Sequence, residues 1–104
     1  MSYRMFIDDE RYPVDDSVIV RGYTDFYYMV VTRGFPHFIS FDHDLGDGPT
    51  GMDIAKSIVD MDIEGIIDIP EDFSYYVHSQ NPIGKGNIEG LLNNYLINKG
   101  ATNK

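Results

Sequence analysis

The chain has 104 residues, of which 17 are acidic and 8 are basic, so its formal net charge is -9. This length suits a single domain, 1–104, and leaves no room for separate binding and catalytic domains. A hydrophobic content of 42% predicts a folded chain rather than a disordered one. The negative charge argues against duplex DNA and anionic membranes as partners, because their phosphates would be repelled.

The sequence contains no cysteine, which excludes disulfides, thiolate zinc sites, iron–sulfur clusters and cysteine nucleophiles. Any metal must therefore be bound by oxygen or imidazole nitrogen. The first ten residues become charged too early for a secretory signal, and no apolar run approaches the roughly 20 residues that span a bilayer. We therefore expect a cytoplasmic protein.

Strands are predicted where short runs are apolar and β-branched or aromatic, and helices where apolar residues recur every three to four positions. The expected strands are 3–7, 17–21, 37–41 and 73–77. The expected helices are 24–33, 51–63 and a last one around 88–99, which Gly100 would end so that 100–104 form a frayed tail. Residues 66–69 fit either a short strand or a packed loop.

This order of elements predicts an α/β domain with a mainly parallel sheet of about four to five strands and helices on both faces, a three-layer α/β/α arrangement. Ligands of such sheets bind beyond the carboxyl ends of the strands. Three polar clusters follow predicted strand ends, and we expect them to converge there. They are Asp8-Asp9-Glu10, Asp42-His43-Asp44 and His78-Ser79-Gln80-Asn81.

The acidic clusters suggest a divalent cation, because neighbouring carboxylates repel one another unless cations, donors or water compensate. Mg²⁺ or Mn²⁺ suits acids from several strand ends, since Mg²⁺ keeps much of its water and also accepts phosphate oxygens. The candidate ligands are Asp8, Asp9, Asp42 and Asp44. Solvated acidic turns explain the same residues without any metal.

Histidine occurs in two of the clusters, as His43 and His78. Both titrate near neutral pH and could share general acid and base roles at a phosphate, although a structural, hydrogen-bonded histidine is the simpler alternative. If the expected strand 37–41 continued to residue 44, Asp42 and Asp44 would face one side of the sheet and His43 the other. His37 would lie at the opposite edge of the sheet and is expected to be structural.

Gly84-Lys85-Gly86 precedes the last predicted helix. Its backbone N–H groups, the helix dipole and one ammonium group could hold an anion, or the segment could simply be a flexible helix entry.

Three blocks together resemble the cyclic-phosphate processing receiver domain. They are Ile7-Asp8-Asp9-Glu10-Arg11 with Pro13, Ser40-Phe41-Asp42-His43-Asp44-Leu45-Gly46 with Thr50-Gly51, and Val77-His78-Ser79 with Asn81-Pro82 and Gly84. The family has members in bacteria and tailed phages, and the resemblance implies a receiver-like fold and the processing of cyclic phosphates, for example at RNA ends. It also implies a metal-binding pair, Asp8 and Asp9, an acid ending the central strand, Asp42, and a phosphate-contacting hydroxyl, Ser79.

Two departures from ordinary receivers argue against aspartyl-phosphate signalling. No fifth strand ending in lysine follows Ser79, and Lys85 could replace that lysine only if its loop folded back over the site. His43 and His78 are additions that suit acid–base chemistry.

The leading hypothesis is a metal-assisted phosphoesterase acting on a small cyclic nucleotide or an RNA terminus. Asp42, His43 and His78 would be catalytic, while Ser79, Asn81 and Lys85 would hold phosphate oxygens. Two alternatives remain: a non-catalytic receiver-like module that binds phosphate or a partner, and an acidic protein that inhibits a host factor by occupying a basic groove.

Overall fold

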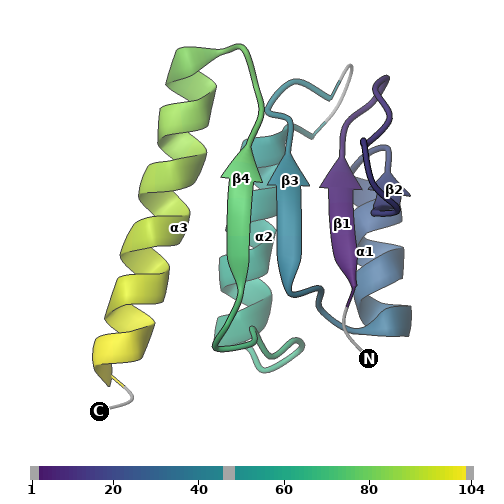
Figure 1. Cartoon of the computed structure of the whole chain (residues 1–104). Helices are drawn as coiled ribbons and strands as arrows, with labels where there is room; N and C mark the ends of the chain where they lie inside the picture. The colour runs from purple at the N-terminus through teal and green to yellow at the C-terminus, as the bar shows by residue number, and fades with distance from the viewer. Residues whose placement is uncertain (1–2, 46–48, 103–104) are drawn as a thin grey trace.

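The computed structural model describes residues 3–45 and 49–102, with side chains up to residue 99. Strands and helices alternate in the predicted order (Figure 1). They are β1 (Arg4–Ile7), β2 (Val18–Val20), α1 (Tyr23–Arg33), β3 (Phe38–Phe41), α2 (Gly51–Ile63), β4 (Ser74–Val77) and α3 (Pro82–Thr102). Residues 66–69 form a packed segment rather than a strand. Within the described ranges, no helix is long and apolar enough to cross a membrane.

The four strands pair in parallel, in the order β2-β1-β3-β4. The register aligns Ile7 with Phe41 and Phe41 with Val77. Two further backbone bonds continue the ladder past the strands, from Asp42 N to the Ile7 carbonyl at 2.9 Å and from His78 N to the Phe41 carbonyl at 2.8 Å. The predicted α/β class with a parallel sheet of four strands is confirmed.

One face of the sheet forms the core. Its side chains are fully buried against α1 and α2, and each such side chain contributes about 1.5–3 kcal/mol by leaving water. The buried strand residues are Met5, Ile7, Val20, Ile39, Phe41 and Val77. Helix α3 runs beside β4 and packs against α2 (Figure 1), where Ile88 and Leu92 complete the core.

The opposite face was expected to carry helices too, but none of the described helices covers it (Figure 1). The direction of each crossover explains why. From β2 to β3 and from β3 to β4 the chain moves one way across the sheet, and right-handed connections then place α1 and α2 on the same face. From β1 to β2 it moves the other way, so residues 8–17 cross the opposite face, and they form a loop without a helix.

The start of α3 corrects the predicted helix entry. The helix begins at Pro82, and the Asn81 side chain accepts a hydrogen bond from the backbone N–H of Gly84 at 3.0 Å. An Asn cap followed by proline is a strong start signal, so Gly84-Lys85-Gly86 lies inside the helix and is not a loop before it.

The end of α3 is also different from the prediction. Gly100 does not stop the helix, which continues to Thr102, so 100–102 are helical and not a frayed tail. A glycine inside a helix costs only about 1 kcal/mol relative to alanine, and such a cost is easily offset by packing of the preceding turns. Helix α1 begins at Tyr23, after Gly22, one residue before the start expected from the sequence.

Asp62 connects α2 to α3 at the end of the sheet opposite the polar clusters. Its carboxylate accepts hydrogen bonds from Tyr95 Oη at 2.5 Å, from Lys99 Nζ at 2.8 Å and from the backbone N–H of Ile69 at 3.3 Å. Burial alone would raise the pKa of Asp62, but these donors outweigh it and hold the pKa below its usual value. Burial and the nearby carboxylate raise the pKa of Tyr95 to about 12.

We expect Asp62→Asn to lower the free energy of unfolding at pH 7 by about 1–3 kcal/mol, because a hydrogen-bonded charge is removed from Lys99. A carboxyl group with a lowered folded-state pKa stabilises the fold above its unfolded pKa of about 3.9, and this stabilisation disappears as the pH falls through the folded pKa. Urea unfolding at pH 7 and in acid measures the difference. Asp60→Asn, on an exposed position of α2, is the control. If Asp62→Asn lowered the free energy of unfolding by the same amount at every pH, the charge-based explanation would be wrong.

Candidate functional site

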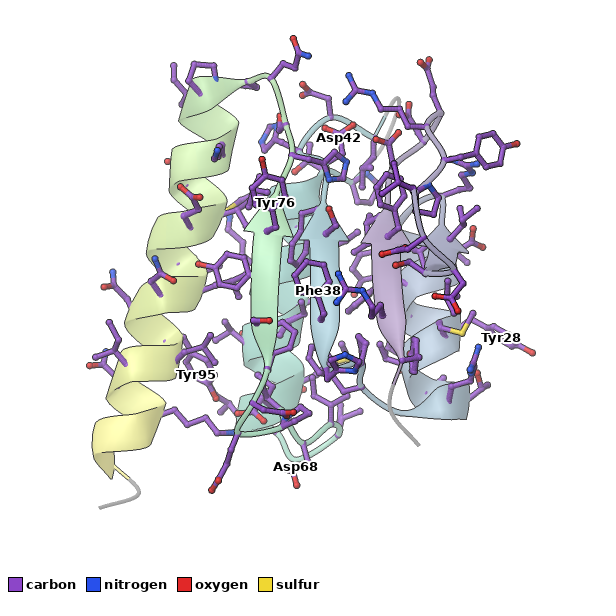
Figure 2. All side chains as sticks on the ribbon, in the orientation of Figure 1. Tyr28, Phe38, Asp42, Asp68, Tyr76 and Tyr95 are labelled. Carbon is purple, nitrogen blue, oxygen red and sulfur yellow. The ribbon has the colours of Figure 1, made fainter. Side chains whose placement is uncertain are left out.

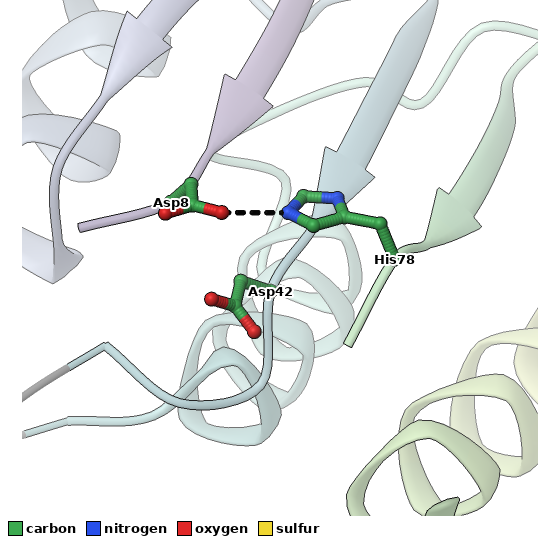
Figure 3. Close-up of side chains that lie close together, drawn as sticks. All are labelled: Asp8, Asp42 and His78. Atoms are coloured by element: carbon green, nitrogen blue, oxygen red, sulfur yellow. Dashed lines mark hydrogen bonds and ion pairs between the residues drawn. The ribbon is translucent and has the colours of Figure 1, made fainter. Parts of the chain in front are cut away.

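Asp8, Asp42 and His78 form one group at the carboxyl edge of the sheet (Figure 3). One potential ligand atom from each residue lies within 4.8 Å of the others. Each residue directly follows a strand, β1, β3 or β4, and the register sets the three side by side. The predicted convergence of the three segments is therefore realised through one residue from each cluster.

Asp8 is almost completely buried, with 1% of its surface exposed. Its Oδ1 accepts the backbone N–H groups of Glu10 and Arg11, both at 2.9 Å, and its Oδ2 lies 3.0 Å from His78 Nε2. Burial alone would raise the pKa of Asp8, but the two N–H donors and His78 outweigh it and lower the pKa. Asp8 is therefore an anion that only accepts hydrogen bonds, so Nε2 of His78 carries a proton in this arrangement.

The ring of His78 is held on three sides. Besides Asp8, its Nδ1 lies 2.7 Å from Ser40 Oγ, and its plane stacks on Phe6 with a centroid separation of 4.9 Å and an interplanar angle of 2°. Sequence reasoning did not select Ser40. The available signal was strand alternation, which sets Ser40 on the face opposite the buried Ile39 and Phe41.

Asp42 has the opposite electrostatic environment from Asp8. Burial raises the pKa of the Asp42 carboxyl, and the negative charges of Asp8 and Asp44 add to this, while the Asp44 backbone N–H and His78 offset only part. That N–H donates to Asp42 Oδ1 over 3.3 Å. The group therefore contains one stabilised carboxylate, Asp8, and one carboxylate whose negative charge is unfavourable, Asp42. A bound cation would offset the charge of Asp42.

The other acidic and histidine candidates lie outside this group. His43 Nδ1 pairs with Asp44 Oδ1 at 3.0 Å, and the Asp44 side chain is exposed. Asp9 is half-buried next to Asp8. The strand ends at Phe41, so the predicted alternation of Asp42, His43 and Asp44 does not extend through this segment.

Two glycines let helices approach the segment 42–43 closely. A Cβ atom on Gly51 would lie 2.2 Å from the Asp42 carbonyl oxygen, and one on Gly84 would lie 2.4 Å from Cγ of His43. Gly51 N also donates to the His43 carbonyl at 2.8 Å. The first turns of α2 and α3 thus fix the backbone and ring that follow β3.

The predicted phosphate-binding residues have local structural roles. Ser79 Oγ accepts the backbone N–H of Asn81 at 3.0 Å, and Asn81 in turn caps α3. Lys85, in the first turns of that helix, places Nζ 5.6 Å from the ring centroid of Tyr76. The glycine-rich loop after Leu45 lies partly outside the described residues, which omit 46–48.

The parallel sheet, its helices and the polar side chains beyond the carboxyl ends of its strands define an α/β domain whose polar residues lie where such sheets bind ligands. A family model, the cyclic-phosphate processing receiver domain, matches residues 3–94. The chain therefore belongs to this family, and the resemblance noted in the sequence is confirmed. No curated protein and no solved structure matches the chain.

The two helical glycines Gly84 and Gly86 provide a matched pair. Gly84→Ala should destabilise the fold, because its methyl group would overlap the His43 ring, whereas Gly86→Ala meets no atom within 4 Å and should stabilise α3 by roughly 0.5–1 kcal/mol. Urea unfolding of both variants measures the difference. Equal stabilisation by both would contradict the close packing of α3 on His43.

Proposed function

We propose that this domain holds a divalent cation with Asp8, Asp42 and His78 and opens a cyclic phosphate on a nucleotide or an RNA end. The observation that carries the proposal is the group itself, in which potential ligand atoms from three separate strand ends lie within 4.8 Å of one another. Membership of the cyclic-phosphate processing family supplies the substrate class. The site adds residue types that suit phosphate chemistry.

The donor set fits a divalent cation. Two carboxylates and one imidazole suit Mn²⁺ well, while Mg²⁺ would rely on the carboxylate oxygens and water. Burial and the neighbouring carboxylates raise the pKa of Asp42, so a positive charge beside it would be favourable. Once bound, such a cation polarises a phosphoryl group and lowers the pKa of a bound water.

The surrounding residues would orient the ligands. The N–H groups of Glu10 and Arg11 fix the Asp8 carboxylate. Ser40 fixes the His78 ring. If Nε2 bound a cation, the ring proton would be on Nδ1, which would donate a hydrogen bond to Ser40 Oγ. This is the usual way in which a second hydrogen bond selects the tautomer of a ligating histidine.

A histidine that binds the cation cannot also exchange protons with the substrate, so that task falls to His43. Its Nδ1 is held by Asp44 Oδ1 at 3.0 Å, and this leaves Nε2 as the atom that gives or takes a proton. Packing against Gly84 keeps the ring in place.

A second candidate is a non-catalytic receiver-like module that binds phosphate or a partner. One observation favours it: Asp8 and His78 already satisfy each other through the bond of 3.0 Å between Oδ2 and Nε2. In that case the pair would be a structural element of the sheet edge, and the domain would show no turnover.

We expect Asp42→Asn to stabilise the cation-free protein and to abolish its stabilisation by Mn²⁺. The raised folded-state pKa means that ionised Asp42 opposes folding at pH 7, and a neutral amide removes this effect. In the wild type, a cation at roughly a hundredfold excess over Kd should add about 2.7 kcal/mol of stability. Thermal unfolding with and without Mn²⁺ or Mg²⁺ measures both effects. Asp60→Asn is the control, and an equal cation effect in Asp42→Asn would place the binding elsewhere.

We expect turnover of a nucleoside 2′,3′-cyclic phosphate in the presence of Mn²⁺ or Mg²⁺, followed by phosphorus NMR. His43→Ala should lower kcat by about 10²-fold or more, the contribution typical of a general acid or base. His37→Ala changes the same residue type at the opposite edge of the sheet and should leave kcat unchanged. Cation binding without turnover would support the non-catalytic module instead.

A further inference from the structure

The uncovered face of the sheet contains a groove of about 400 Å³. Its floor is made of strand side chains from β1, β3 and β4, and the loop 12–17 forms one wall. Its lining includes Arg4, Phe6, Phe38, Ser40, Tyr76 and His78. Figure 2 shows Phe38 and Tyr76 on this face, with Asp42 above them at the carboxyl edge. The volume is within the range of about 300–1,000 Å³ found for small-molecule sites.

Aromatic rings of the groove have cationic neighbours. The Arg4 guanidinium, which lines the groove, lies 4.1 Å from the centroid of Phe38, and Lys85 Nζ, which is not part of the groove lining, lies 5.6 Å from the centroid of Tyr76. Tyr76 is 55% exposed, although tyrosine rings in strands are usually packed against a neighbour. Among the residues that line the groove, Arg4 forms an ion pair with Asp15 at 3.4 Å.

Nucleobases are the ligands that such surfaces recognise, because every base has a π-face that stacks on an aromatic ring or on a guanidinium plane. A second copy of the chain fits less well, because two chains that each carry a net charge of -9 repel each other.

The groove is continuous with the candidate cation site. His78 lines the groove, and its Nε2 belongs to the group with Asp8 and Asp42. Ser40 also lines the groove and contacts His78 Nδ1 at 2.7 Å. A phosphate held by the site would thus leave the rest of its molecule next to the aromatic floor.

We propose that this groove binds the base and ribose of the substrate and so favours nucleoside cyclic phosphates over base-free ones. The inference rests on the proposed function and assigns the part of the site that recognises the nucleoside. Binding of the base is set by Phe38 and Tyr76, whereas the chemistry is set by the strand-end group.

The test compares two cyclic phosphates, adenosine 2′,3′-cyclic phosphate and the base-free glycerol 1,2-cyclic phosphate. Tyr76→Val and Phe38→Ile remove a ring while keeping residues that favour strands. We expect each variant to raise KM for the adenosine substrate by about fivefold or more, the lower limit for losing one base-ring stack, with kcat and the glycerol substrate little changed. Tyr28→Val, at a somewhat more exposed tyrosine on α1, is the matched control.

Adenosine alone provides a readout that is independent of turnover. Its addition should shift the backbone NMR signals of Phe38, Ser40 and Tyr76 and leave those of Tyr28 in place. Binding of adenosine without turnover of either phosphate would contradict the proposed function and leave the base site standing. No shift at the groove, equal effects of Tyr76→Val on both substrates, or a dimer that Tyr76→Val dissociates would overturn the base site.

Discussion

The parallel register of β1, β3 and β4 is the constraint on which the site depends. Because Ile7, Phe41 and Val77 are aligned, the next residue of each strand reaches the same edge of the sheet, and these residues are Asp8, Asp42 and His78. Side chains alternate between the faces, so a slip of one residue would exchange the buried and exposed sets of a strand. The fully buried side chains of Ile7, Phe41 and Val77 therefore hold the polar residues in place.

The edge combines stabilising and destabilising electrostatics. Asp8 receives two backbone N–H groups and the His78 ring, whereas Asp42 faces other negative charges in a partly buried position. The ionised Asp42 carboxylate is therefore unfavourable in the free protein, and the proposed cation would offset its charge. The hydrogen bonds that Asp62 accepts from Tyr95 and Lys99 lie at the far end of α2 and α3, away from these strand-end charges.

Much of the architecture was predictable because strand and helix periodicities are local. The convergence of the polar clusters also followed from the sequence, since parallel strands share an edge for their carboxyl ends. The hydrogen-bond partners of the individual site residues could not be predicted. Ser40 resembles any small strand residue, and the orientation of His43 depends on the chain leaving the strand after Phe41. The uncovered face could not be predicted, because the order of elements does not reveal the direction of each crossover.

The positions of glycines gave wrong predictions for both the start and the end of α3. Gly84 and Gly86 predict a loop before the helix and Gly100 predicts its end, whereas the helix begins at Asn81-Pro82, which in the sequence fits a turn or a helix start. The structure shows a packing reason for Gly84, where the helix touches the His43 ring. From the sequence alone, a glycine that allows close packing cannot be distinguished from a glycine that forms a turn, because the neighbouring element is not known.

The most direct test of the strand-end site is paramagnetic broadening of backbone NMR signals by substoichiometric Mn²⁺. If Asp8, Asp42 and His78 form a single cation site, signals from residues adjoining all three should broaden together, while those around Asp62 at the opposite end of the sheet stay sharp. Broadening of only one strand end, or of scattered acidic surface positions, would contradict it.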